Sequence, residues 1–90
     1  MRYAFTLKGN KFQYYKFTTP TDKVYLGIVA SAPVDVFIID NIGVIKFSRK
    51  NEKVHEGTFD INVKSEWMLM IGNGSTEEIN VDCEIRPPRS

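Results

Sequence analysis

The sequence contains few of the residues on which reactive and metal-binding sites depend. Among its 90 residues there is one cysteine, Cys83, and one histidine, His55. This excludes an internal disulfide, a cysteine-based zinc site and a histidine-pair metal site. No serine stands in a nucleophile motif such as G-x-S-x-G. We therefore predict no enzymatic activity, no metal and no cofactor, with His55 a partly exposed strand or loop residue and Cys83 a small core residue.

An excess of one charge and a long apolar run are also missing. Twelve basic and eleven acidic side chains give a formal net charge of +1, so no overall field draws the chain to nucleic acid or to an anionic membrane. No segment approaches the roughly 18 apolar residues of a membrane span, and residues 1–8 lack the apolar core of a signal peptide. We expect a cytoplasmic protein that binds no membrane, since a single cysteine is compatible with a reducing compartment.

Apolar and polar residues alternate through most of the chain. In residues 59–64 the side chains of Phe59, Ile61 and Val63 share one face, and residues 78–86 repeat the pattern. A period of two is typical of strands that bury one face. The pattern predicts seven or eight short strands in all. Turn residues separate five further segments of this kind, at residues 3–8, 12–18, 23–31, 34–40 and 66–71.

The connections between these segments are short, and this decides the architecture. Parallel strands need crossovers of about 10–12 or more residues, so these strands must pair antiparallel. We predict an all-β fold, a jelly-roll-like antiparallel β-sandwich, with a small closed barrel as the alternative. Residues 41–47 have the spacing of one short helical turn and residues 48–53 form a polar, mobile stretch, although a strand fits residues 41–53 as well. We expect residues 1–86 to form a single domain and residues 87–90 a flexible tail.

Three segments resemble a known pattern. Residues 32–40 read APVDVFIID, residues 56–61 read EGTFDI after Phe47, and residues 67–73 read WMLMIGN. This succession is similar to that of small jelly-roll-like β-sandwich domains of the GOLD (p24-like) and bacterial pre-peptidase C-terminal kinds. The resemblance implies the same fold, and a role in protein interaction or beside a larger domain. It implies no site residues for this chain.

An interaction surface is expected where apolar side chains fall on both faces of a strand. Met68 and Met70 alternate with Trp67 and Leu69, so one pair must lie opposite the core. Flexible methionines are frequent at protein-binding surfaces. We therefore predict a non-catalytic protein-interaction module with a surface that includes Met68, Met70 and Tyr15. Its partner is another protein or a second copy of the chain.

Two other functions stay open as alternatives. Asp35 and Asp40 fit a sandwich that binds calcium or, with the aromatic residues, carbohydrate; we expect instead that Asp35 bonds a backbone amide and Asp40 caps a turn. Tyr14, Tyr15 and Phe17 lie among lysines, which fits an OB-like barrel that binds single-stranded nucleic acid. Two of these three rings must point inward on any strand, which favours the protein-interaction module.

Overall fold

The computed structural model describes residues 1–19, 21–62 and 64–88. These residues form six strands, and every pairing among them is antiparallel. The prediction of an all-β antiparallel fold is confirmed. No helix in the described ranges is long and apolar enough to cross a bilayer. The strands are β1 (Arg2–Leu7), β2 (Phe12–Thr18), β3 (Lys23–Ile39), β4 (Ile45–Asp60), β5 (Glu66–Gly72) and β6 (Ile79–Arg86).

The described residues contain fewer strands than the sequence predicts. One reason is that two segments predicted as separate strands form a single strand in the structure. Residues 23–31 and 34–40 belong to the 17-residue strand β3, which continues through Pro33. Proline has no backbone N–H and normally interrupts a ladder. Here the register between β3 and β4 jumps from Val29 to Val34, so Pro33 lies where that ladder is already broken. The missing donor therefore costs no ladder hydrogen bond, and the strand bends at this point instead of ending.

Residues 41–53 fit a short helical turn with a loop as well as a strand, and the structure has the strand: β4 covers most of this range, so the helical turn is wrong. The chain turns at residues 41–43, and β4 then includes the whole polar stretch 48–53. Pairing with β3 overrides the weak strand propensity of these residues. Asn51 has a φ of 58°, a left-handed conformation that asparagine tolerates. Its N–H donates to Asp35 Oδ1 at 2.9 Å, which fixes the backbone where β4 follows the bend of β3.

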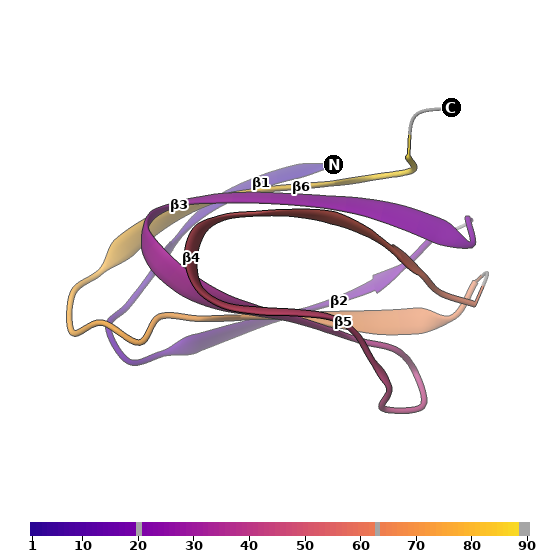
Figure 1. Cartoon of the computed structure of the whole chain (residues 1–90), viewed down its shortest axis with the longest axis horizontal. Helices are drawn as coiled ribbons and strands as arrows, with labels where there is room; N and C mark the ends of the chain where they lie inside the picture. The colour runs from indigo at the N-terminus through magenta and orange to yellow at the C-terminus, as the bar shows by residue number, and fades with distance from the viewer. Residues whose placement is uncertain (20, 63, 89–90) are drawn as a thin grey trace.

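The sheet curls around this bend. Its strand order is β1-β6-β3-β5-β2, with β4 paired to β3. The first half of β3 pairs with β6 and the second half with β5, so the bent β3–β4 pair carries the sheet from one layer into a second that faces it (Figure 1). These pairings form one curled antiparallel sheet. They do not form the two separate sheets of the predicted sandwich, because β3 and β4 run through both layers.

The core lies between the two layers. Its largest side chain is Trp67, whose ring centroid lies 4.8 Å from that of Phe17 and 5.1 Å from that of Phe59. Strands β1 and β2 stand at the two ends of the strand order, and their Tyr3 and Tyr15 rings stack with centroids 6.0 Å apart. Aromatic contacts thus join strands that share no ladder in the part of the chain that the structure describes.

Some expectations concern residues outside the described ranges. These are Pro20, one of the turn residues expected between residues 12–18 and 23–31, the core-facing side chain of Val63, and the end of the tail at Arg89 and Ser90. They stay predictions, as does the assignment of residues 1–86 to one domain.

Candidate interaction surface

Strand β5 has apolar side chains on both of its faces. Trp67, Leu69 and Ile71 are at most 1% exposed and face the core. The intervening Met68 and Met70 are half-buried and lie on the other side. In a strand with one solvated face these positions would carry polar side chains. The methionines therefore place apolar groups on the outer surface of the sheet.

The pairing register continues this apolar surface onto the neighbouring strands. Tyr14 of β2, Met70 of β5 and Phe37 of β3 are direct neighbours in one row. In the next row Met68 lies beside Ile39. We call this outer surface the apolar face, and it consists of Phe12, Tyr14, Phe37, Ile39, Ile45, Met68 and Met70.

Several members of the apolar face are strongly exposed. Phe12, Tyr14 and Ile45 keep 52%, 54% and 58% of their surface exposed. The ring centroids of Phe12 and Tyr14 are 6.5 Å apart, and the Lys50 ammonium lies 5.8 Å from the centroid of Phe37. Single exposed apolar residues are ordinary. A contiguous set of aromatic, methionine and isoleucine side chains is typical of a protein-binding surface.

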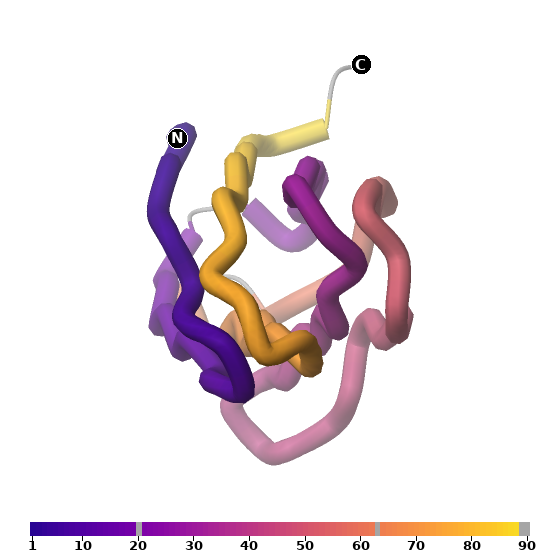
Figure 2. Tube along the Cα trace, turned by 90° about the vertical axis from the view of Figure 1, so that its left-hand side faces the viewer, coloured from indigo at the N-terminus to yellow at the C-terminus, as the bar shows by residue number. Residues whose placement is uncertain are grey.

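The loop between β3 and β4 continues the apolar face beyond the sheet. It extends away from the rest of the fold (Figures 1 and 2), and we call residues 40–45 the hairpin tip. Ile42 is 74% exposed, the highest value for a large apolar side chain in the described ranges, and Val44 is 46% exposed. Ile45 belongs to both the tip and the apolar face. The two surfaces are therefore continuous.

Asp40 holds the hairpin tip in one conformation. The backbone N–H groups of Ile42 and Val44 donate to its Oδ1 at 3.0 Å and 2.8 Å. Its Oδ2 lies 3.8 Å from Lys46 Nζ, and the side chain is only 8% exposed. Gly43 has a φ of 89°, a region open mainly to glycine. A polar turn residue thus supports an apolar tip.

Lysine side chains border the apolar face. Lys11 precedes Phe12, Lys16 lies beside Met68 in its row, and Lys46 and Lys50 follow Ile45 along β4. Glu66 Oε1 lies 4.0 Å from Lys16 Nζ, in an exposed pair that contributes little to stability. The border of the face is therefore charged, with Lys16 and Lys46 each beside a carboxylate and Asp35 in the row of Phe12.

Asp35 and Asp40 have backbone partners in different parts of the fold. Asp35 accepts the N–H of Asn51 at the bend, and Asp40 accepts two N–H groups at the hairpin tip. The predicted backbone bonds of both residues are confirmed. Within the described ranges, no group of three or more His, Cys, Asp or Glu side chains could hold a metal ion.

His55 is a core residue, so the prediction of a partly exposed histidine is wrong. It is 0% exposed because it pairs with Ile28 and shares the inward-facing side of β4. Its Nε2 lies 3.0 Å from the carbonyl oxygens of both Val34 and Glu52. Both partners are acceptors, so Nε2 carries the hydrogen. Nδ1 has no hydrogen-bond partner among the described residues. His55 therefore fastens the bend from inside and is not accessible to a substrate.

Tyr15 does not join the apolar face. It lies on the inner side of β2, with its ring centroid 5.3 Å from that of Phe5. Burial, followed by the neighbouring Cys83 and Tyr3, raises the pKa of Tyr15. Burial also raises the pKa of the Cys83 thiol to about 12, which keeps it protonated at neutral pH. Of the three predicted surface residues, the structure brings Met68 and Met70 together on the outer surface and separates Tyr15 from them.

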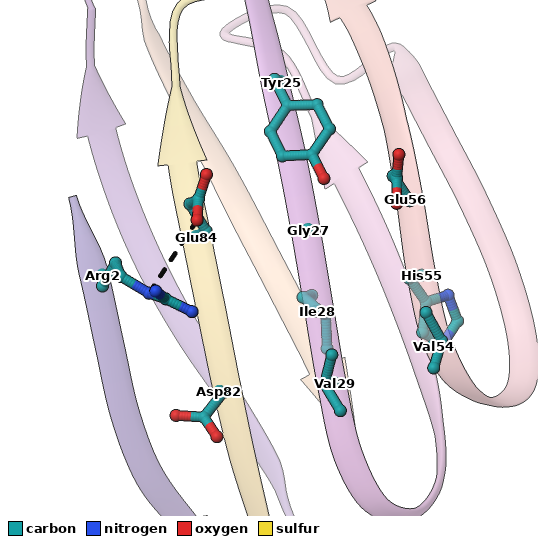
Figure 3. Close-up of a pocket in the computed structure, with 10 residues that line it drawn as sticks. All are labelled: Arg2, Tyr25, Gly27, Ile28, Val29, Val54, His55, Glu56, Asp82 and Glu84. Carbon is teal, nitrogen blue, oxygen red and sulfur yellow. Dashed lines mark ion pairs between the residues drawn. The ribbon is translucent and has the colours of Figure 1, made fainter.

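The outer face of the opposite layer carries a shallow groove, lined by charged side chains and by the exposed Val29 and Val54 (Figure 3). Gly27 lies at its centre, and the Tyr25 hydroxyl is 2.9 Å from the position that a Cβ on Gly27 would take. Its volume of about 210 Å³ is below the range of about 300–1,000 Å³ typical of small-molecule sites. The other side chains around it include Arg2, Val29, Val54, Glu56, Asp82 and Glu84.

Charged pairs and stacking occupy much of this groove. Glu84 contacts both Arg2, at 3.9 Å, and Arg86, at 2.6 Å. The Arg86 guanidinium lies 4.0 Å from the centroid of Tyr25 and so covers the ring. These side chains already have partners for their charge and their aromatic face. The apolar face is therefore the stronger candidate for a functional surface.

Comparisons with known proteins relate this chain to others by fold. No protein family and no curated protein matches its sequence. Among solved structures it is similar to the Yersinia pseudotuberculosis-derived mitogen, with a TM-score of 0.75 and 15% identity over 100% of this chain and 86% of that chain. A de novo designed double-stranded β-helix gives a TM-score of 0.62 and 12% identity over 96% of this chain and 99% of that chain. PliG of Salmonella Typhimurium, a periplasmic inhibitor of g-type lysozyme, gives a TM-score of 0.53 and 12% identity over 96% of this chain and 86% of that chain.

At these identities the comparisons show a small all-β fold and carry no function with them. No match supports the resemblance to GOLD (p24-like) or pre-peptidase C-terminal domains. The comparisons support only the coarser part of that prediction, namely that the chain forms a small β-rich domain.

Proposed function

We propose that this protein is a non-enzymatic protein-interaction domain that binds its partner through the apolar face. The observation that carries the proposal is the row formed by Tyr14, Met70 and Phe37 across three strands. Apolar surface left in water opposes stability by about 25 cal/mol per Å², and burial against a partner removes that penalty. A contiguous apolar face therefore favours association.

The composition of the face supports a protein as the partner. Aromatic and methionine side chains are enriched in protein interfaces, and methionine adapts its shape to the surface it meets. The bordering lysines provide the polar rim that surrounds the apolar centre of such interfaces. This combination fits a reversible protein contact.

Two of the similar structures are compatible with this role. PliG is an inhibitor of another protein, g-type lysozyme, and the Yersinia protein is a mitogen. Among the described residues, the thiol of Cys83 and the imidazole of His55 are buried in the core, where they cannot reach a substrate. Both observations support a function in binding and not in catalysis.

Comparative affinity purification tests the proposal with three forms of the protein. The first is the wild type, the second carries Met70→Lys at the centre of the apolar face, and the third carries Val29→Lys on the opposite outer face. Val29 is 56% exposed, so it is a suitable control position. Each form is immobilised and incubated with lysate of the cells that produce the protein, and retained proteins are quantified by mass spectrometry.

We expect to find at least one protein that the wild type and the Val29→Lys form retain in equal amounts. The Met70→Lys form should retain at least tenfold less of the same protein. A lysine at the centre of a desolvated interface introduces an unpaired charge, which explains the loss. Circular dichroism verifies that the three forms are folded. Equal retention of every protein by all three forms contradicts the proposal.

A further inference from the structure

We propose that strands β1 and β2, which form two free edges of the curled sheet, pair with the same strands of a second copy of the chain. Strand β1 of each copy lies antiparallel to β2 of the other, and a two-fold axis parallel to these strands relates the two copies. The contact uses strand edges and leaves the outer surfaces of both layers open. The inference therefore does not rest on the proposed function.

Strands β1 and β2 form edges on the same side of the molecule. Within the described ranges β1 pairs only with β6, and β2 pairs only with β5. Both strands lie on the far side of the fold in Figure 1, and Figure 2 shows β1 on the side opposite to β4. They run in opposite directions, because β1 is parallel to the first half of β3, β2 is parallel to the second half, and β3 reverses at its bend. The molecule therefore presents two antiparallel edges, one from each layer.

The free edge of β1 directs backbone groups outward at every second residue. At the start of the β1–β6 ladder, the Met1 ammonium donates to Ile85 O at 2.7 Å and the Ile85 N–H donates to Met1 O at 2.8 Å. Bonded and non-bonded pairs alternate along an antiparallel ladder. The N–H and C=O groups of Arg2, Ala4 and Thr6 therefore point away from β6.

The free edge of β2 has the same property. Next to the β2–β5 ladder, the Asn73 N–H donates to Lys11 O at 2.9 Å, which makes these two residues a bonded pair. The alternation continues from this pair along β2. The residues whose backbone groups point away from β5 are therefore Phe12, Tyr14, Lys16 and Thr18.

Neither edge carries the features that normally prevent pairing with another chain. Natural edge strands are protected by lysine, by proline or by bulges. Strand β1 has no lysine and no proline, β2 has one lysine, and both keep one register along their whole length. The third edge, β4, has three lysines and lies in a ladder with register shifts. Strands β1 and β2 are therefore the edges suited to pairing.

A second copy of the chain matches both edges at once. A two-fold rotation about an axis parallel to the strands exchanges the two layers and keeps the direction of each strand. It therefore places β2 of one copy beside β1 of the other, antiparallel to it, and forms the symmetry-related pair at the same time. A single extended peptide would pair with one edge and leave the other free.

The rotation also sets the register between the copies. It causes no shift along the axis, so each β1 residue faces the β2 residue that lies at its own level within one molecule. Two aromatic contacts define these levels: the ring centroids of Tyr3 and Phe17 are 5.7 Å apart, and those of Phe5 and Tyr15 are 5.3 Å apart.

This register brings together the positions whose backbone groups point outward. By the same offset, Ala4 of one copy faces Lys16 of the other, and the two remaining pairs are Arg2 with Thr18 and Thr6 with Tyr14. Each pair can exchange two backbone hydrogen bonds, because both of its members direct N–H and C=O away from their own sheet. A shift of one residue would lose every one of these bonds.

Charge favours this arrangement over its alternatives, because like charges directly opposite each other destabilise a strand pair. None of the pairs above opposes two charges. The register that follows the longer contact between Tyr3 and Tyr15, at 6.0 Å, sets Arg2 opposite Lys16. A two-fold axis perpendicular to the layers pairs each strand with itself. Centred on Ala4 it sets Lys16 against Lys16, and centred on Phe5 it sets Arg2 against Lys8.

Light scattering during size exclusion tests whether the chain pairs through these edges. The mass of one chain is 10.3 kDa, and we expect the measured mass to rise toward twice this value with concentration. Ala4→Pro should stay monomeric at every concentration, because it removes an outward N–H in the middle of β1. Proline is tolerated where the N–H faces away from the sheet. Ala4→Ser keeps the N–H and should associate within about twofold of the wild type. Thermal unfolding verifies that both variants are folded.

Disulfide cross-linking tests the arrangement without any edge-breaking change. Ala4→Cys protein is mixed with Lys16→Cys protein and oxidised. Both positions are exposed, and the native Cys83 is buried. Cα atoms of a bonded antiparallel pair lie about 5.5 Å apart, within the range that a disulfide spans. We expect the mixture to form a covalent dimer that contains one chain of each variant, and each variant alone to remain monomeric.

The other outcomes contradict the inference in distinct ways. A wild type that is monomeric at every concentration, or a folded Ala4→Pro variant that associates like the wild type, shows that these edges do not pair. If Ala4→Cys links to itself, β1 pairs with β1 and the proposed arrangement is wrong. If Met70→Lys abolishes self-association and Ala4→Pro does not, the second copy covers the apolar face instead. The affinity purification is decided separately, so failure here leaves the proposed function standing.

Discussion

The ring of Phe47 lies against the backbone of Gly57, although the two residues belong to opposite arms of the bent strand β4. A Cβ on Gly57 would lie 2.7 Å from Cε2 of Phe47, closer than carbon atoms approach one another. Phe47 pairs with Ile38 in one layer, and Gly57 pairs with Leu26 in the other. The contact therefore joins the two layers of the curled sheet, and the missing side chain at position 57 makes room for it.

Gly57→Ala should destabilise the fold by about 1–3 kcal/mol, because the added methyl group displaces the Phe47 ring. Urea unfolding followed by circular dichroism measures the change. Gly74→Ala is the matched control, since a Cβ there meets no described atom within 4 Å. We expect the control to stay within about 0.5 kcal/mol of the wild type. Similar losses in both variants would show that the contact between the layers is not tight.

Trp67→Ala should cost about 3–5 kcal/mol, which is enough to unfold a domain of this size. Trp67 is 1% exposed and packs between Phe17 and Phe59. Tyr14→Ala, on the apolar face, should change stability by less than about 0.5 kcal/mol, because Tyr14 is 54% exposed. Thermal melts monitored by circular dichroism compare the two. A loss below about 1 kcal/mol for Trp67→Ala contradicts its place in the core.

Stability should fall at high pH because of Cys83. Burial raises the pKa of its thiol from 9.0 to about 12, so the folded state keeps a proton that the unfolded state loses. This contribution is fully present below about pH 9 and is lost as the pH rises toward 12, by about 1.4 kcal/mol per pH unit. Urea unfolding at a series of pH values should show the decline, and Cys83→Ala should reduce it. The same decline in both forms would assign it to other groups.

Asp40→Ala should loosen the hairpin tip without unfolding the sheet. The variant removes the carboxylate that accepts the N–H groups of Ile42 and Val44, and each bond contributes about 1 kcal/mol. Amide hydrogen exchange measured by NMR should become roughly tenfold faster at these two positions. The amide of Ile28, in the core of β3, should exchange as before. Unchanged exchange at Ile42 and Val44 would mean that Asp40 does not fix the tip.

Local pattern predicts the faces of the strands but not their lengths. The period of two correctly places Trp67, Leu69 and Cys83 in the core. It fails at Pro33 and at residues 48–53, where turn-forming and polar residues interrupt the pattern. Both segments are held in strands by pairing between β3 and β4, and these contacts between distant residues leave no local signal. The burial of His55 has the same cause, because it depends on the bend.

The apolar face is only partly visible in the sequence. Met68 and Met70 are apparent because they alternate with obvious core residues. In β2, Tyr14 and Tyr15 are adjacent and equally aromatic, so composition does not tell which one faces outward. Ile42 and Ile45 have helical spacing, and the turn that presents them instead depends on the Asp40 carboxylate. Sequence pattern therefore indicates that an interaction surface exists, and the pairing register is needed to assign its members.

The central claim is that a protein partner buries the apolar face, and the methionine methyl groups test it most directly. The chain has three methionines: Met68 and Met70 lie on the face, whereas Met1 is 62% exposed and bonded to Ile85 of β6. Carbon-13 methyl NMR of the protein is recorded with and without the protein retained in the affinity purification. The signals of Met68 and Met70 should shift or broaden while that of Met1 stays in place. Binding that leaves both face methionines unchanged would contradict the claim.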